Sequence, residues 1–333
     1  FFDVDWRPVK AELENKVLVP VLGDQYGVVL ERGELRLVRE GGSFFVTYFA
    51  HRFPVAPRQV PQVLAHRLEE LRQKLGPEEP SVWELESICT SLVKLAPRSE
   101  TDPQKVAERA REKEVAKRRL AALCEASPGV REHVDANVAL FNGRPGDARS
   151  FDLLDRLLDA QAYRLAFWRV AGEEINYRRF FDVNGLAAIR MEDARVFDEA
   201  HGLVLALFRR GEVNGLRIDH PDGLYDPEAY FRRLQASALV ERGRALAEAR
   251  GGRLDGAAEA ALRARVVAGL AAGELPPRPL YVVAEKILAG RERMPESWAI
   301  DGTTGYEFLA AASGLFVDAA AEEAITEGYA RFI

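Results

Sequence analysis

The spacing of apolar residues predicts a mainly helical segment over residues 58–170. Apolar side chains recur there three and four positions apart, which is the repeat of an amphipathic helix. One stripe covers residues 60–75 and stops at Gly76-Pro77, and another covers residues 150–168. These stripes are predicted to be core, and the segment is predicted to be a helical insertion.

Charge is concentrated in the middle of that segment. Asp102 before Pro103 supplies an N-cap and a first-turn proline for a highly charged helix. Its basic residues, at 113–119, alternate with Glu112 and Glu114. Mixed signs of this kind are typical of a solvated helix face rather than of a nucleic-acid site.

Residues 1–57 are predicted to form a small β-rich segment. Strand-like residues at 26–30 and 35–38 flank a Glu-Arg-Gly-Glu loop, which is a hairpin signal with glycine in the loop. A third strand is expected at 44–49, after a Gly-Gly-Ser turn.

From about residue 171 the pattern changes to alternating strands and helices, so residues 171–333 are predicted to form one part of a catalytic barrel. A helix over about 193–210 precedes a short apolar strand that ends at Asp219, and a second apolar strand ends at Glu285. This alternation is typical of parallel strands joined by helices. The Ala- and Arg-rich stretch 236–278 is longer than one crossover helix needs and is predicted to be an extra helical insertion.

The carboxylates that close the two strands are the candidate chemistry. Because side chains alternate along a strand, Arg217 and Asp219 share one face. Adjacent parallel strands that each end in an acid resemble staves of a barrel with catalytic groups at its mouth. A retaining glycosidase needs an ionised nucleophile and an acid/base. Asp219 beside Arg217 suits the first role, and Glu285 suits the second.

Each half of this pattern also has an ordinary structural explanation. Arg-x-Asp at a strand end is usually an ion pair, and Ala-Glu-Lys after an apolar strand is common. Only the occurrence of both motifs on successive strands makes a catalytic role as well supported as a structural one. His220 fits a structural hydrogen bond or a contact to a sugar hydroxyl, and Asp222 and Asp226 fit turns. Three aromatic residues fit either the core or stacking on sugar rings: Trp298, Tyr306 and Phe308.

Composition narrows the class of protein. The 333 residues, 47% of them hydrophobic, suffice for one large domain or two smaller ones. The net charge of −6 argues against a general nucleic-acid binder.

Two cysteines, Cys89 and Cys124, make no disulfide framework, so a cytoplasmic location is expected. No apolar run approaches the ~20 residues of a membrane span, and no cluster suggests a metal or other cofactor. The absence of a signal peptide and of an initiator Met predicts an excerpt of a longer protein.

The segments around the two acids resemble a known group of enzymes. Residues 215–220 (Gly-Leu-Arg-Ile-Asp-His) resemble the nucleophile segment of the α-amylase superfamily, and residues 283–285 (Val-Ala-Glu) resemble its acid/base segment. Five segments resemble the maltooligosyl trehalose synthase family in particular: residues 15–27, 174–182, 221–227, 285–288 and 302–308. Apart from the Ala-rich insertion, the resemblance runs from the first residues to about residue 310.

This resemblance implies an isomerase that acts on maltooligosaccharides. Such an enzyme converts the reducing-end α-1,4 bond into an α,α-1,1 bond, so that the product ends in a trehalose unit. Asp219 would form the covalent glycosyl-enzyme and Glu285 would protonate the departing glucose, in a retaining double displacement. The glucose must be retained and turned over while water is kept out. No cofactor is implied, and a trehalose-releasing hydrolase is a possible functional partner.

The resemblance also implies which side chains contact the glucan. The implied substrate-binding residues are Arg217, His220, Lys286, Tyr177, Arg178, Arg179 and Tyr306. Of these, the run 177–180 and the loop that contains Tyr306 are the candidates for lining the pocket of the departing glucose.

Two superfamily motifs are missing, because no Asn is followed by His and no His is followed by Asp. The chain is therefore predicted to be an internal fragment of a (β/α)8 TIM barrel, around strands four and five, with a large helical insertion and a small β-rich subdomain. The third catalytic acid is expected beyond Ile333, and the isolated fragment is expected to be inactive. Two other functions stay open: an α-glucan hydrolase or other transglycosylase, and a non-catalytic glucan-binding module.

Overall fold

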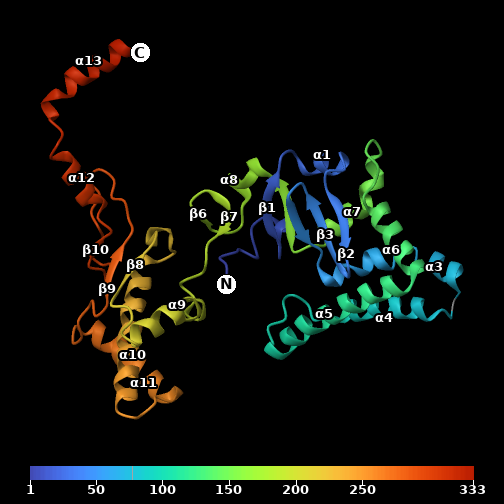
Figure 1. Ribbon diagram of the computed structural model, residues 1–333, viewed down its shortest axis with the longest axis horizontal. Helices are drawn as coiled ribbons and strands as arrows, with labels where there is room; N and C mark the ends of the chain where they lie inside the picture. The colour runs from blue at the N-terminus through green and yellow to red at the C-terminus, as the bar shows by residue number, and fades with distance from the viewer. Residues whose placement is uncertain (77) are drawn as a thin grey trace. The chain divides into compact units, whose positions relative to one another are not determined.

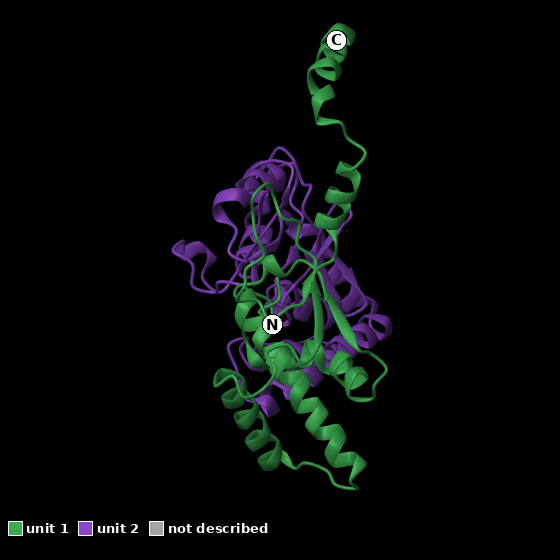
Figure 2. Ribbon diagram, turned by 90° about the vertical axis from the view of Figure 1, so that its left-hand side faces the viewer, with its two compact units in different colours: residues 1–3, 188–333 green, residues 4–187 purple. Residues whose placement is uncertain are grey.

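The computed structural model describes residues 1–76 and 78–333, which form two compact units (Figure 2). One unit comprises residues 4–187, and the other comprises residues 1–3 and 188–333. The sequence-based division at residues 57 and 170 stays a prediction about how the chain is organised.

In the unit formed by residues 4–187, helices and two small sheets share one core (Figure 1). β1 (Val17–Leu22) pairs in parallel with β5 (Tyr163–Phe167), while β2 (Arg36–Glu40), β3 (Ser43–Tyr48) and β4 (His51–Pro54) form an antiparallel meander. A short hairpin comprises β6 (Arg179–Phe180) and β7 (Val183–Ala187). The helices are α1 (Tyr26–Glu31), α2 (Pro61–Leu64), α3 (Leu68–Leu75), α4 (Pro80–Lys94), α5 (Pro103–Ala126), α6 (Pro128–Phe141), α7 (Asp152–Asp159) and α8 (Ala171–Glu174).

Two predictions for this unit are confirmed. Asp102 caps α5, where its carboxylate accepts hydrogen bonds from the main-chain N–H groups of Gln104 (2.9 Å) and Lys105 (3.0 Å). The strand expected at 44–49 is β3. Its alternate residues Phe44 and Val46 are buried, as expected for a strand with one face on a core.

The strand predicted at 26–30 is wrong, because these residues belong to helix α1. Val28-Val29 favours a strand by propensity, but tertiary contacts decide. Val29 and Leu30 are both buried, and the Tyr26 hydroxyl donates to Asp155 in α7 (2.7 Å). The loop glycine was identified correctly, since Gly33 has a φ of +69°.

The helix predicted over 150–168 is also wrong in its second half. It ends at Asp159, and residues 163–167 form β5, which pairs with β1 and buries Leu165. The buried side chain of Gln161 fixes the turn between them. Its amide donates to the Leu157 carbonyl oxygen (2.5 Å) and accepts from Ala56 N–H (2.7 Å).

The stripe at 60–75 is helical but interrupted. Arg67, with a φ of +54°, separates α2 from α3. The buried Asn137 amide donates to the carbonyl oxygens of Val63 (2.9 Å) and His66 (2.7 Å) and so stabilises the break. The predicted stop at Gly76 is confirmed, whereas Pro77 lies outside the described residues.

The unit formed by residues 1–3 and 188–333 has the predicted alternation of helices and strands. β8 (Gly215–Ile218), β9 (Tyr281–Ala284) and β10 (Gly302–Thr303) form a parallel sheet in the order β10-β9-β8. The helices are α9 (Ala194–Arg209), α10 (Pro227–Ala249), α11 (Gly256–Ala271), α12 (Tyr306–Gly314) and α13 (Glu322–Phe332). Helices α10 and α11 occupy most of the predicted insertion at 236–278. The described residues form this three-stranded sheet and no closed barrel, so the barrel stays a prediction.

One face of the sheet packs on helices. Leu216, Ile218, Val282 and Ala284 join an apolar cluster with residues of α9 and α10, including Phe231. Alternate residues point the other way, and among them Arg217 and Tyr281 are exposed. Asp219 and Glu285 therefore lie at the ends of strands whose apolar face packs on α9 and α10.

Buried Gln235 of α10 holds the start of β9. Its amide donates to the carbonyl oxygens of Leu280 (2.9 Å) and Ala299 (2.8 Å), and its oxygen accepts from Leu280 N–H (2.8 Å). At the next position, Val282 N–H donates to the Asp301 carboxylate (2.8 Å). These bonds fix the relative positions of β9 and the segment that enters β10.

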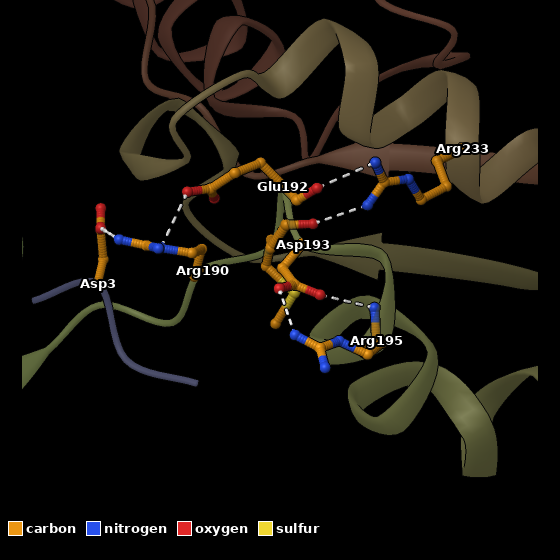
Figure 3. Close-up of polar contacts among 7 residues, drawn as sticks. Asp3, Arg190, Glu192, Asp193, Arg195 and Arg233 are labelled. Carbon is orange, nitrogen blue, oxygen red and sulfur yellow. Dashed lines mark hydrogen bonds and ion pairs between the residues drawn. The ribbon is translucent and has the colours of Figure 1, made fainter. Parts of the chain in front are cut away.

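A charged cluster holds the segment before α9 (Figure 3). Arg190 lies between Asp3 (2.9 Å) and Glu192 (3.6 Å), and Arg233 of α10 donates to the carbonyl oxygens of residues 191 and 192 (both 3.1 Å). Asp193 caps the first turn of α9. Asp3 is thus bound to the segment before α9, within the unit of residues 1–3 and 188–333.

Candidate active site

β8 and β9 bring the two predicted acids to the same end of the sheet. The parallel register pairs Ile218 with Ala284, and Glu285 N–H donates to the Ile218 carbonyl oxygen (2.8 Å). Asp219 and Glu285 are therefore the next matched residues beyond the two strands. Since neighbouring strands lie about 4.8 Å apart, side chains at matched positions can meet.

The Arg217 guanidinium bridges the two carboxyl groups. Its Nη1 lies 3.0 Å from Asp219 Oδ1, and its Nη2 lies 3.1 Å from Glu285 Oε2. A planar guanidinium can engage two carboxylates at once through its fork of N–H donors. The predicted sharing of a face by Arg217 and Asp219 is confirmed by this contact.

The arrangement lowers the pKa of Asp219 below its ordinary value. The main cause is a hydrogen bond with the side chain of Glu285, followed by the hydrogen bond and charge of Arg217. An ionised nucleophile is what a retaining reaction needs at its start.

Tyr306, at the start of α12, contacts the same pair. Its hydroxyl donates to Glu285 Oε1 (3.0 Å), and this bond is the main cause that raises the pKa of Tyr306. The preceding Gly305 has a φ of +102°, a conformation that favours glycine and turns the chain from β10 into the helix. The sequence predicted Tyr306 as a substrate contact, and the structure adds its bond to the acid.

His220 and Lys286 follow the two acids in sequence and meet at a third carboxylate. His220 Nδ1 lies 3.0 Å from Asp222 Oδ1, and Lys286 Nζ lies 3.4 Å from Asp222 Oδ2. Lys286 Nζ also lies 2.8 Å from Glu292, whose hydrogen bond is the main cause that raises the pKa of Lys286. Asp222 does lie in a tight turn, Pro221–Gly223, as predicted, but it also links the two basic residues.

Backbone geometry fixes the His220 ring. His220 has a φ of +45°, which is uncommon for a residue with a side chain. A Cβ placed on Gly223 would lie 2.6 Å from the His220 ring. Gly223 therefore leaves the space that the ring occupies beside Asp222.

The remaining predicted contacts, Tyr177, Arg178 and Arg179, belong to the unit of residues 4–187. The Tyr177 hydroxyl donates to the Asn184 carbonyl oxygen (2.6 Å), and Arg179 donates to the Asn184 side chain (2.6 Å). These bonds join the strands of the β6–β7 hairpin. Their place in a glucan site stays a prediction.

The two other aromatic candidates differ. Trp298 packs on the core of its unit, with its ring 5.2 Å from that of Phe231, whereas Phe308 is 78% exposed.

Among the described residues, no group of three or more His, Cys, Asp or Glu side chains is placed to hold a metal ion. Within residues 1–76 and 78–333, no helix has the length and apolar character of a membrane span.

Sequence reasoning missed Glu292 and Gln235. Glu292 reaches Lys286 across a loop without regular structure, and Gln235 of α10 bonds main-chain atoms of Leu280, 45 positions away and just before β9. Neither residue lies in a local motif, so no signal in the sequence pointed to them.

No family model matches the chain. Two strains of Mycobacterium tuberculosis, CDC 1551 / Oshkosh and ATCC 25618 / H37Rv, each have a protein named "Putative maltooligosyl trehalose synthase" that is 33% identical over 168 residues. That match covers 50% of this chain and 17% of the relative.

Solved structures of similar name also match. Maltooligosyltrehalose synthase from Arthrobacter ramosus is 26% identical, with a TM-score of 0.49 over 98% of this chain and 25% of the other. A hypothetical maltooligosyl trehalose synthase from Sulfolobus tokodaii is 22% identical, with a TM-score of 0.45 over 100% of this chain and 26% of the other. The chain thus spans about a sixth of the length of its curated relatives. The sequence similarity to those relatives confirms the resemblance to maltooligosyl trehalose synthases that the motifs indicated.

Proposed function

We propose that this chain carries the nucleophile and the acid/base of a maltooligosyl trehalose synthase, within a (β/α)8 catalytic domain. The observation that carries the proposal is the Arg217 bridge between Asp219 and Glu285 at the ends of adjacent parallel strands. The name of the curated relatives, maltooligosyl trehalose synthase, supports a maltooligosaccharide as the substrate class. An intramolecular transfer is the reaction that the resemblance implies.

In the first half-reaction, the ionised Asp219 carboxylate attacks the anomeric carbon on the non-reducing side of the last α-1,4 bond. The bond from that carbon to the bridging oxygen breaks, and the Glu285 carboxyl proton moves to that oxygen. A glycosyl–Asp219 ester and a free glucose result. The lowered pKa of Asp219 favours the ionised form that this step needs.

In the second half-reaction, the same glucose turns so that its anomeric hydroxyl faces the ester. Glu285, now ionised, takes the proton of that hydroxyl while its oxygen attacks the anomeric carbon, and Asp219 leaves as a carboxylate. The new bond is α,α-1,1 and both inversions cancel. Because no water is consumed, the pocket must hold glucose and exclude solvent.

Substrate binding must leave room for a sugar between the two acids, because retaining enzymes hold their carboxyl groups about 5–5.5 Å apart. The Asp219 side chain is 62% exposed and can move, while Glu285, 24% exposed, is held by Tyr306. We infer that Asp219 rotates toward the sugar and Arg217 remains with Glu285.

The predicted substrate contacts are assigned on the same basis. Arg217 and Tyr306 would orient the acids and contact the sugar next to them, and the His220–Asp222–Lys286 group would bind its hydroxyls. The run 177–180 would line the pocket of the departing glucose. A functional coupling to a trehalose-releasing hydrolase fits a product that ends in trehalose.

The test uses the full-length protein that contains this chain, with maltopentaose as substrate. A product of the same mass without a reducing end is expected. Asp219→Asn is expected to lower kcat by roughly 10⁴-fold, because the amide cannot form the ester. Asp226→Asn is the matched control, since Asp226 caps α10 and Asn caps equally well.

Other outcomes decide between the alternatives. Release of glucose with new reducing ends would indicate a hydrolase instead. Binding of maltopentaose with no product, unchanged by Asp219→Asn, would indicate a glucan-binding module.

A further inference from the structure

The unit of residues 4–187 contains a cavity of about 680 Å³ that no step of the proposed reaction uses. It lies beside the C-terminal end of α4, the first half of α5 and the segments that enter β1 and β5. Small and apolar side chains, including Val106, Ala110 and Ala162, form part of its lining. Sites for small molecules commonly have volumes of about 300–1,000 Å³, so this cavity is large enough for one.

Three arginines, Arg58, Arg98 and Arg109, line this cavity together with Lys16 and Lys113. Each guanidinium donates a hydrogen bond to a main-chain carbonyl oxygen, namely those of Leu95, Asn15 and Pro97 respectively. The Arg98 guanidinium also lies 4.6 Å from the centre of the Trp6 ring. The three side chains are therefore held in place, with several N–H donors of each left over.

Basic residues outnumber acidic ones around the cavity, since its five basic side chains face Glu14 and Asp159; Arg58 and Arg98 are exposed to solvent and Arg109 is partly buried. Within residues 1–76 and 78–333, no Asp or Glu comes within ion-pair distance of Arg58, Arg98 or Arg109, and a carbonyl oxygen carries no net charge to cancel a guanidinium. Lys16 pairs with Asp159 at 2.7 Å, and Lys113 has only Glu114, at 3.9 Å. Partial desolvation lowers the pKa of Arg98, although the residue remains exposed.

We propose that this cavity binds a phosphorylated small molecule. Guanidinium forks match phosphate oxygens in pairs, and a dianion compensates more than one of the three arginines. The apolar part of the lining suits the carbon skeleton that carries the phosphate. A neutral glucan offers the guanidinium groups no charge to pair with, and the chain's net charge of −6 disfavours a nucleic acid as the occupant.

The test is isothermal titration calorimetry on the purified full-length protein, at constant ionic strength. The probes are inorganic phosphate, pyrophosphate and glucose 6-phosphate, with glucose as the neutral control. Saturable binding of at least one phosphate is expected. A higher affinity for glucose 6-phosphate than for inorganic phosphate identifies an organic phosphate as the class of ligand, and the reverse order identifies free phosphate.

The variants localise the site. Arg98→Ala and Arg109→Ala are each expected to weaken phosphate binding by about tenfold or more. Arg118→Ala is the matched control, because Arg118 lies on α5 like Arg109 but is exposed and outside the cavity. This variant should bind phosphate as the wild type does. Arg109→Lys, which keeps the charge but not the fork, should fall between wild type and Arg109→Ala, even where the alanine variant folds poorly.

Three results would overturn the proposal. They are the absence of saturable binding by all three phosphates, equal affinity for glucose and glucose 6-phosphate, and binding that Arg98→Ala, Arg109→Ala and Arg109→Lys leave unchanged. Activity on maltopentaose is a separate measurement, so failure here leaves the proposed function untouched.

Discussion

The two compact units bury their apolar residues to very different extents. In residues 4–187, one cluster joins strands and helices from Leu22 to Leu165. In the other unit the largest cluster is confined to α9, α10 and the strands, and, as far as the structure describes them, α12 and α13 contain no buried residue. Large apolar side chains such as Phe316 and Phe332 are 90% and 89% exposed there.

This difference shows that the two units are held together by different means. The unit of residues 4–187 has a continuous core, where shape and close packing dominate stability. The unit of residues 1–3 and 188–333 holds its sheet with a small core and with specific hydrogen bonds, above all those of Gln235. The candidate catalytic pair lies in this unit, so its geometry depends on single polar contacts more than on core volume.

The first prediction tests close packing in residues 4–187. Gly42, in the turn before β3, approaches α5 so closely that a Cβ would lie 1.8 Å from the Lys117 carbonyl oxygen. Gly42→Ala must therefore push main chain apart and is expected to lower the free energy of unfolding by about 3 kcal/mol. Urea denaturation followed by circular dichroism measures this.

Gly27→Ala is the control, because a Cβ there meets nothing within 4 Å. As Gly27 lies in helix α1, alanine should leave stability unchanged or raise it by up to about 1 kcal/mol. Equal stability of the two variants would contradict the view that close packing dominates this unit.

The second prediction tests the polar contacts of the other unit. Gln235→Met keeps the approximate shape but leaves Leu280 N–H and two carbonyl oxygens without their partner. A loss of about 2 kcal/mol is expected. Hydrogen exchange should become faster at Val282, since that amide lies in β9 next to the lost bonds.

Gln73→Met, on the exposed face of α3, is the matched control and should change neither quantity. Unchanged exchange in the Gln235 variant would mean that the small apolar cluster alone holds β9. The contrast between the two units would then disappear.

The same contrast explains what the sequence could predict. The pairing of Asp219 with Glu285 was predictable, because both acids end apolar strands and matched strand ends lie together in a parallel sheet. Helix α9 and the cap of α5 were predictable because their signals are local. In these cases a few neighbouring residues contain all the information.

Other features depend on contacts between distant segments. Residues 26–30 have strand propensity but form a helix that buries Val29 and Leu30 and donates a hydrogen bond to Asp155 in α7. Residues 163–167 have a helical pattern but form a strand that pairs with β1. Lys286 and Asp222 meet across 64 positions. The pattern of a single sequence does not show which distant segments meet. Helix α1, strand β5 and the contact of Lys286 with Asp222 could therefore not be predicted.

The third prediction concerns the bond that holds Glu285. Tyr306→Phe removes the hydroxyl that donates to Glu285 Oε1 while it keeps the ring. The acid then loses its fixed orientation, and kcat in the full-length protein is expected to fall about tenfold with little change in KM. Tyr329→Phe, on exposed α13, is the control. A rate loss of the same size in both variants would argue against a role for the Tyr306 hydroxyl.

The smallest expected effect is a shift in pH dependence. Asp219 must be ionised to attack, and its pKa is held below the ordinary value by the hydrogen bond with Glu285 and by Arg217. The ionised form is present above that lowered pKa and is lost as the pH falls through it, so the acid limb of kcat/KM should lie below the range of an ordinary Asp.

Arg217→Gln removes one of the two causes and should move this limb to higher pH, toward the ordinary value. The stability that ionised Asp219 contributes has the same sign, since it is present at higher pH and lost on acidification. Arg195→Gln is the control, because Arg195 is 92% exposed and pairs with Asp193 instead. An acid limb that stays in place, or moves to lower pH, would mean that Arg217 does not act on the nucleophile and that the pair depends on Glu285 alone.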